Sequence, residues 1–145
     1  MLISASAGNF THFLYSFILN IIMKEVILDT SFILTCVKQK IDFFEEIKLM
    51  GLSVVIPRLV IKELEKISVS EKKLHFREDA VLTLNLLEKN KFRETGLDGK
   101  DVDSGIIKIA RADKYKIIAT LDKRIKNSIN NPKLIIRDKK RLEIV

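Results

Sequence analysis

Four short apolar runs rich in β-branched residues, separated by stretches of helical pattern, constrain the fold of this chain most strongly. The runs cover residues 25–28, 52–56, 116–120 and 133–136. Helical patterns fill the remaining chain at residues 30–37, 43–50, 58–67, 70–90, 101–114 and 122–129. Strands that alternate with helices at this spacing indicate a parallel sheet covered by helices. The sequence therefore predicts a single α/β domain with a mostly parallel sheet flanked by helices.

Capping signals place several boundaries between these elements. We expect Asp42 to be the N-cap of the helix over 43–50 and Gly51 to follow its C-terminus. Pro57 is expected at the first position of the next helix, where its missing N–H is harmless. A polar loop that contains glycine is expected over residues 94–100. These signals leave no room for a linker between two domains.

The composition narrows the class of protein and its compartment. The chain has 145 residues, of which 47% are apolar, so it has enough apolar material for one packed core. Its single cysteine, Cys36, excludes a disulfide scaffold and a multi-cysteine zinc ribbon. We expect this cysteine to be a small buried hydrophobe and the protein to be cytoplasmic.

The positive charge is concentrated in the last quarter of the chain. The net charge is +7, yet residues 108–145 carry a balance of +8 and residues 1–107 a balance of −1. A concentrated basic surplus favours a polyanion partner such as RNA or DNA. A solvated, lysine-rich surface of the kind found in heat-adapted proteins explains the same composition. Charge alone leaves both interpretations open.

Residues 1–22 differ from the rest because they contain no Asp, Glu, Lys or Arg. Their apolar run over 13–22 is short for a membrane span, and no positive segment precedes it as in a secretory signal. We therefore expect no membrane association. We interpret Met23 as the biological start, with residues 1–22 an upstream extension and residues 23–145 the domain. The alternative is an extra amphipathic helix that covers an apolar surface or forms a dimer contact.

Four acidic residues are expected at one edge of the sheet. Asp29 and Asp122 each follow a predicted strand, and ligand sites in open α/β sheets lie beyond the carboxyl ends of the strands. On helical wheels, Glu63 lies at the edge of a buried stripe, and Asp103 lies on the core-facing side of a first turn. Each acid alone is explained by a helix cap or an exposed ion pair. Four converging carboxylates instead require a cation, and oxygen ligands suit Mg²⁺ or Mn²⁺.

Four blocks in this order and spacing resemble the PIN domain family, over residues 24–145. The blocks are Val26–Ser31, Val55–Leu64, Val102–Ala110 and Ile118–Asp122. The resemblance implies a Rossmann-like α/β/α sandwich. It also implies a set of catalytic, metal-binding acids, which are Asp29, Glu63, Asp103 and Asp122. Ser31 and Thr120 are the hydroxyl neighbours expected to orient these groups. Ser104 departs from the family pattern of a second adjacent acid, and we expect Asp101 to compensate.

The resemblance implies a Mg²⁺- or Mn²⁺-dependent endoribonuclease that hydrolyses RNA phosphodiester bonds. Lys123, Arg124 and Lys126 directly follow Asp122, and we expect them to hold the phosphates of single-stranded or structured RNA. Residues 117–126 resemble the archaeal and eukaryotic branch that processes ribosomal RNA more than the toxins of toxin–antitoxin pairs.

Several alternatives remain open at this point. The chain is either a processing enzyme, with a ribosome-assembly protein as partner, or a toxin ribonuclease with an antitoxin. A non-catalytic RNA-binding or assembly module of the same fold is a further alternative, although all four acids are intact. A phosphoacceptor receiver domain would need another acid next to Asp29, and none is present. A homodimer is an open alternative to a monomer.

Overall fold

A six-stranded sheet forms the centre of the domain. The computed structural model describes residues 3–22, 24–70, 73–96 and 100–145. Within these residues the strand order is β3-β2-β1-β4-β5-β6. The strands are β1 (Glu25–Leu28), β2 (Ser53–Pro57), β3 (Arg93–Thr95), β4 (Ile117–Ala119), β5 (Lys133–Arg137) and β6 (Arg141–Ile144). The first five strands pair in parallel and β6 pairs antiparallel with β5, which confirms the predicted mostly parallel sheet.

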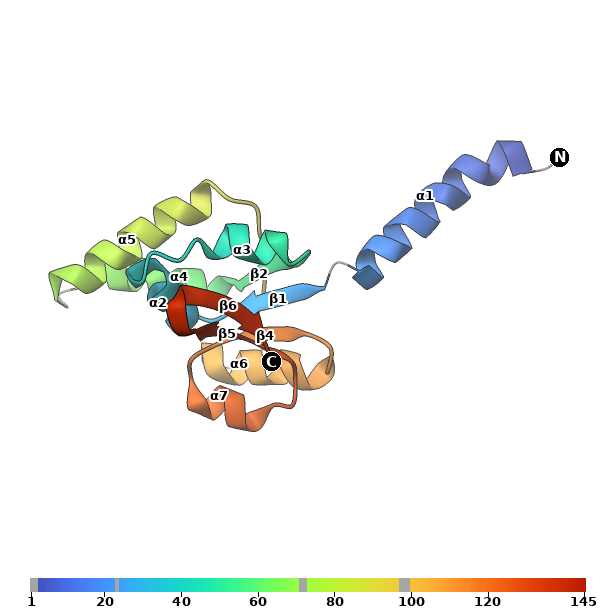
Figure 1. The fold of residues 1–145 in the computed structure, drawn as a ribbon. Coiled ribbons are helices and arrows are strands. Elements are labelled where there is room, and N and C mark those ends of the chain that lie inside the picture. The colour runs from blue at the N-terminus through green and yellow to red at the C-terminus, as the bar shows by residue number, and fades with distance from the viewer. Residues whose placement is uncertain (1–2, 23, 71–72, 97–99) are drawn as a thin grey trace.

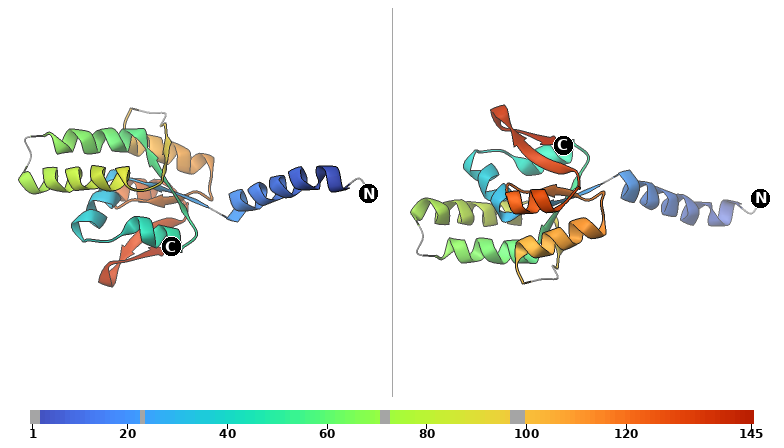
Figure 2. Two further views of the ribbon diagram at one scale, coloured as in Figure 1. Left: turned by 90° about the horizontal axis from the view of Figure 1, so that it is seen from above. Right: turned by 90° about the horizontal axis from the view of Figure 1, so that it is seen from below.

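Helices cover both faces of the sheet and make a three-layer α/β/α sandwich, as predicted (Figure 1). One face carries α2 (Thr30–Lys38), α3 (Phe43–Leu49), α4 (Arg58–Ser68) and α5 (Leu74–Glu88). The other carries α6 (Val102–Ala112) and α7 (Lys123–Ser128). The chain crosses to the second face after β3, because the strand order reverses direction there and crossovers keep one hand. Helices α4 and α5 lie side by side (Figure 2).

The core forms where apolar side chains from the central strands meet apolar stripes of the helices. Residues 26–28 of β1 and 117–119 of β4 are almost fully buried, because parallel strands are covered on both faces. Helix α6 contributes Val102, Ile106 and Ala110, spaced by four so that they share one face. Cys36 is fully buried as predicted, and burial raises the pKa of its thiol to about 12.

A buried asparagine ties the second helical layer to the sheet. Asn131 precedes β5 and is 4% exposed. Its amide nitrogen donates to three backbone carbonyl oxygens: those of Ala110, Asp113 and Lys116, at 3.0, 2.8 and 2.9 Å. These acceptors belong to the end of α6 and to the turn into β4. The asparagine therefore helps to fix α6 relative to β4.

Several boundaries differ from the sequence predictions. Pro57 was expected at the first helical position, but its ψ of 140° makes it the N-cap of α4, because it still pairs with Thr95 as the last residue of β2. The expected loop over 94–100 begins with the edge strand β3, and its residues 97–99 lie outside the described residues. The helix expected over 70–90 is α5 at Leu74–Glu88, with residues 71–72 also outside the described residues. Strand β6 was not predicted.

Helix α3 begins as predicted and ends one residue earlier, at Leu49, with Met50 as its C-cap. Asp42 is its N-cap, and its carboxylate accepts a hydrogen bond from the backbone nitrogen of Glu45 at 3.1 Å. Gly51 follows the C-cap with a φ of 75°, the left-handed conformation that favours glycine.

Helix α1 (Ile3–Ile22) points away from the sheet (Figure 1). Several of its large apolar side chains are exposed, among them Phe13 and Phe17, whose rings stack on each other. No helix among the described residues is long and apolar enough to span a membrane. The interpretation of residues 1–22 as an upstream extension stays a prediction.

Candidate functional site

Asp29 lies at the carboxyl end of β1 and is the most firmly held of the four predicted acids. The residue is 4% exposed, and its backbone nitrogen donates to the carbonyl oxygen of Ala119 in β4 at 2.9 Å. Its Oδ1 caps α2 by accepting from the backbone nitrogen of Thr30 at 2.8 Å. Its Oδ2 accepts from the hydroxyls of Ser31 at 3.1 Å and Thr120 at 2.8 Å. These bonds fix the carboxylate at the edge of the sheet.

Two hydroxyls connect Asp29 to the segment that follows β4. Thr120 is 1% exposed, and its Oγ1 accepts from the backbone nitrogen of Asp122 at 3.0 Å while it donates to Asp29. Ser31 Oγ accepts from the backbone nitrogen of Leu121 at 3.3 Å. Both hydroxyls thus contact the Asp29 carboxylate, and their role in orienting a ligand stays a prediction. Asp122 itself caps α7, because its Oδ1 accepts from the backbone nitrogen of Arg124 at 2.7 Å.

Asp103, in the first turn of α6, completes a group of three carboxylates. Burial, the negative charges of Asp122 and Asp29, and a hydrogen bond with Asp122 together raise the pKa of Asp103 to about 6. Arg124 offsets part of this repulsion, since its Nη1 lies 3.9 Å from Asp103 Oδ2. We call Asp29, Asp103 and Asp122 the carboxylate cluster. Sequence reasoning placed all three at one edge of the sheet, and the structure brings them together.

Glu63 and Asp101 lie beside this cluster and make different contacts. Glu63 Oε2 accepts from the hydroxyl of Thr30 at 2.5 Å, so it is connected to Asp29 through the neighbouring residue. Asp101 is the N-cap of α6 and accepts from the backbone nitrogen of Ser104 at 2.7 Å. That hydrogen bond is the main reason why the pKa of Asp101 is lowered. Asp101 therefore acts as a cap here and faces Asp103 only as an additional negative charge.

The donor set of the cluster fits a hard divalent cation. In this conformation no three His, Cys, Asp or Glu side chains of the described ranges surround one point closely enough to enclose an ion. The charges of Asp122 and Asp29 nevertheless reach Asp103, whose pKa is raised first by burial and then by these charges. Oxygen-only donors of this kind suit Mg²⁺ or Mn²⁺. A cation between them would remove the repulsion.

An open groove of about 450 Å³ runs between α6 and α7 next to the cluster. It is lined by Ser104, Ile107, Lys108, Arg111, Arg124 and Ser128, and we call it the α6–α7 groove. Of the three cations predicted to hold phosphates, Arg124 lines this groove, whereas Lys123 and Lys126 occupy other positions of α7.

Sequence reasoning missed Lys108, Arg111 and Thr30. The spacing of Lys108 and Arg111 places them on one side of α6, but the neighbouring helix that makes them part of a groove is visible only in three dimensions. Thr30 gave no local signal, because its partner Glu63 is 33 residues away.

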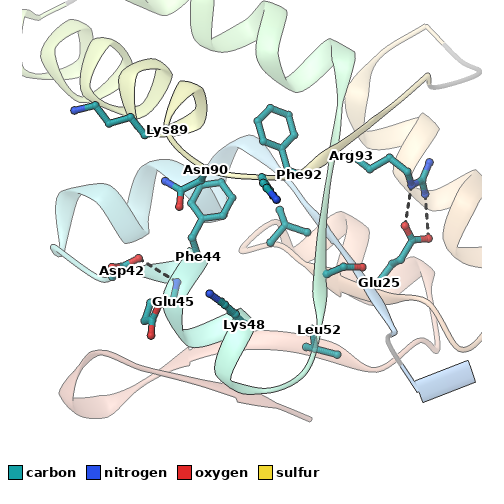
Figure 3. Close-up of a pocket in the computed structure, with 13 residues that line it drawn as sticks. Glu25, Asp42, Phe44, Glu45, Lys48, Leu52, Lys89, Asn90, Phe92 and Arg93 are labelled. Carbon is teal, nitrogen blue, oxygen red and sulfur yellow. Dashed lines mark hydrogen bonds and ion pairs between the residues drawn. The ribbon is translucent and has the colours of Figure 1, made fainter. Parts of the chain in front are cut away.

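A larger cavity, of about 630 Å³, lies at the opposite end of the sheet (Figure 3). Its lining includes the starts of β1, β2 and β3 but none of the four predicted acids. Glu25 at its edge accepts two hydrogen bonds from Arg93, at 2.8 and 3.0 Å, and one from Lys116 at 2.8 Å. The bonds from Arg93 are the main cause that lowers the pKa of Glu25. This cavity is therefore separate from the carboxylate cluster.

Comparisons with known proteins agree with the fold. Ribonuclease VapC4 of Methanocaldococcus jannaschii is 27% identical over 128 residues, which cover 84% of this chain and 97% of that protein. The structure of the PIN domain endonuclease Utp24 superposes with a TM-score of 0.63 at 25% identity, over 83% of this chain and 95% of the other. A domain of a functionally unknown protein from M. jannaschii has the same fold, with a TM-score of 0.52 at 18% identity over 84% of this chain and 98% of that domain.

The family described as PIN-like domain matches residues 26–139, which include all four predicted acids. The match thus covers most of the sheet, its helices and the complete carboxylate cluster. This chain belongs to the PIN-like domain family.

Proposed function

We propose that this protein is a Mg²⁺- or Mn²⁺-dependent endoribonuclease. The observation that carries the proposal is the convergence of Asp29, Asp103 and Asp122 at the carboxyl edge of the sheet, with a pKa of Asp103 raised to about 6 by burial and neighbouring charge. Carboxylates so arranged are poorly compatible with one another and well suited to a divalent cation. The relatives named as a ribonuclease and as an endonuclease support the same class of reaction.

The residues divide into ligands and groups that orient them. Asp29 and Asp103 would be the main ligands, and Asp122 and Glu63 would complete the shell directly or through water. A bound divalent ion supplies an activated water and neutralises charge on the phosphate. Ser31 and Thr120 hold Asp29 by hydrogen bonds at 3.1 and 2.8 Å. Thr30 holds Glu63 in the same way, at 2.5 Å. Such bonds to ligands keep a site ordered before the ion arrives.

Ribosomal RNA is the substrate that we propose first, because residues 117–126 resemble the processing branch of the family. A ribosome-assembly protein would then be the expected partner. The similarity to Ribonuclease VapC4 favours a second candidate, a toxin ribonuclease paired with an antitoxin. Expression in a bacterial host separates the two candidates: a toxin arrests growth unless its antitoxin is present, whereas a processing enzyme leaves growth unchanged.

Substitution of Asp29 by Asn tests the proposed activity. Purified full-length protein is incubated with labelled single-stranded RNA in Mn²⁺, in Mg²⁺ or in EDTA. We expect cleavage with either metal and none in EDTA. We expect Asp29→Asn to abolish cleavage while its circular dichroism spectrum stays that of the wild type. Asp138→Asn, an exposed acid in the turn between β5 and β6, is the matched control and should cleave normally. Equal cleavage by Asp29→Asn and the wild type would show that the assigned site is wrong.

A further inference from the structure

The α6–α7 groove contains three cations and opens directly beside the carboxylate cluster. Lys108 and Arg111 line it from α6, and Arg124 lines it from α7. Arg124 also marks where the groove meets the cluster, because its Nη1 lies 3.9 Å from Asp103 Oδ2. A ligand that fills the groove would therefore reach the acids at this junction.

The cations are arranged along the groove. Ser104, Lys108 and Arg111 are spaced by four and three residues, so they form one stripe on α6. The stripe begins next to Asp103 and extends about 10 Å along the helix axis, since each helical residue adds about 1.5 Å. Helix α7 starts at the same edge of the sheet, directly after Asp122. The groove thus leads away from the cluster between two helices that both begin there.

Arg111 is oriented across the groove by the helix on the other side. Its Nε donates to the backbone oxygen of Ser128 in α7 at 3.1 Å. This bond connects the planar guanidinium to the backbone of the helix on the other side of the groove. An oriented guanidinium suits phosphate oxygens, because its planar fork donates two parallel hydrogen bonds. The polar lining otherwise consists of the hydroxyls of Ser104 and Ser128, which also bind phosphate or ribose oxygens.

Resting on the proposed ribonuclease function, we propose that the α6–α7 groove binds the sugar–phosphate backbone of single-stranded RNA and leads it to the carboxylate cluster. A hollow of about 450 Å³ between two helices has room for a stretch of one sugar–phosphate strand. Cations and hydroxyls without an aromatic platform read phosphates and not bases. This assigns binding to Lys108 and Arg111, in addition to Arg124. Lys123 and Lys126 do not line the groove, so we expect them to contribute less to RNA binding.

The dependence of affinity on salt measures these phosphate contacts. The full-length protein is titrated with a fluorescein-labelled oligouridylate in EDTA, which prevents cleavage, from about 50 to 200 mM KCl. Each single-strand phosphate contact contributes about 0.7 to the slope of log affinity against log salt. We expect Lys108→Gln/Arg111→Gln to flatten the slope by about 1.4, and to weaken binding roughly 10-fold near physiological salt. Lys108→Gln alone leaves the Arg111–Ser128 bond intact and should flatten it by about 0.7.

Two matched double variants control for net charge. Lys62→Gln/Lys66→Gln removes two exposed cations from α4, on the other face of the sheet, and should leave the slope unchanged. Lys123→Gln/Lys126→Gln removes two cations from α7 outside the groove and should change the slope less than the groove pair. The proposal is overturned if Lys108→Gln/Arg111→Gln leaves the salt slope unchanged. It is also overturned if either control pair changes the slope as much as the groove pair does. Mn²⁺ affinity measured by calorimetry should be the same in the groove variant and the wild type.

Two further measurements separate this proposal from others. If a polyglutamate peptide binds as tightly as the RNA and loses the same affinity in the groove variant, the groove serves an acidic protein and the RNA assignment is wrong. If the wild type cuts no RNA in Mn²⁺ but the groove variant still flattens the slope, the proposed activity fails and the groove stands. If the wild type cuts RNA and the slope is unchanged, the activity stands and the groove assignment fails.

Discussion

The substitution Thr120→Val is the sharpest test of how the carboxylate cluster is held. Valine keeps the shape of threonine and removes only the hydroxyl. In the structure this hydroxyl is buried, donates to Asp29 Oδ2 at 2.8 Å and accepts from the backbone nitrogen of Asp122 at 3.0 Å. The substitution therefore removes both hydrogen bonds, the one to Asp29 and the one from the backbone of Asp122, and it opens no cavity.

The expected loss of stability follows from these two hydrogen bonds. A hydrogen bond to a charged group contributes about 1.5–3 kcal/mol, and a neutral one about 1 kcal/mol. We expect the free energy of unfolding of the metal-free protein to fall by about 2–4 kcal/mol, which lowers the Tm of a domain of this size by roughly 6–12 °C. If Asp29 binds the ion, loss of its orienting hydroxyl should also weaken Mn²⁺ binding by about 10- to 100-fold.

Scanning calorimetry in EDTA and isothermal titration with Mn²⁺ measure the two effects separately. Thr120→Ser retains the hydroxyl and should recover most of the metal affinity. Thr83→Val is the matched control, because Thr83 is fully buried in α5 and its hydroxyl donates to the carbonyl oxygen of Asp79 at 2.7 Å, within the same helix. It should lower the Tm and leave Mn²⁺ affinity unchanged. A folded Thr120→Val protein that binds Mn²⁺ as tightly as the wild type would refute the assigned site.

Two other predictions concern pH and the second helical layer. The pKa of Asp103 is raised from 3.8 to about 6, so between these values the folded chain binds more protons than the unfolded chain. The Tm in EDTA should therefore fall as pH rises from 4 to 6, and Mn²⁺ affinity should rise over the same range; a pH dependence retained in Asp103→Asn would contradict this assignment. Asn131→Ala removes the buried side-chain donor to the carbonyl oxygens of Ala110, Asp113 and Lys116 and should lower the free energy of unfolding by about 2–4 kcal/mol in urea denaturation. The exposed neighbour Asn130→Ala should change it by less than about 0.5 kcal/mol, and equal effects would exclude this role for Asn131.

The elements that could be predicted are those whose sequence pattern reflects burial. Strands β1, β2 and β4 contain β-branched runs because helices cover both of their faces. Strand β5 is less buried but contains the apolar run over residues 134–136. The two strands that were missed lie at the edges of the sheet. β3 has mostly exposed side chains, and in β6 only Leu142 is buried. Edge strands without an apolar run have no signal that separates them from loops.

The same distinction applies to the site. Asp29 and Asp122 could be predicted because they directly follow strands, and Asp103 because the helical wheel places it toward the core-facing side of an amphipathic helix, where its side chain is 32% exposed. The contacts between these residues could not be predicted from the sequence. The hydroxyl of Thr120 reaches Asp29 across 91 positions of the sequence, and the groove cations depend on how α6 packs against α7. Contacts between residues far apart in the chain produce no pattern in the local spacing of residues, so they cannot be read from it.

The helix caps explain how the domain brings several carboxylates together before an ion binds. The sequence allowed Asp29, Asp103 and Asp122 each to be either a helix cap or a metal ligand, and the first role leaves acceptor positions free for the second. Asp29 and Asp122 cap α2 and α7 through Oδ1, and an ionised carboxylate has about four acceptor positions. The positive ends of the helices stabilise these negative charges. Asp103 makes no such cap, and it is the acid whose pKa is raised by burial and by the charges of Asp122 and Asp29. A cation would therefore be needed most at Asp103, which is why its ionisation and metal binding should be linked.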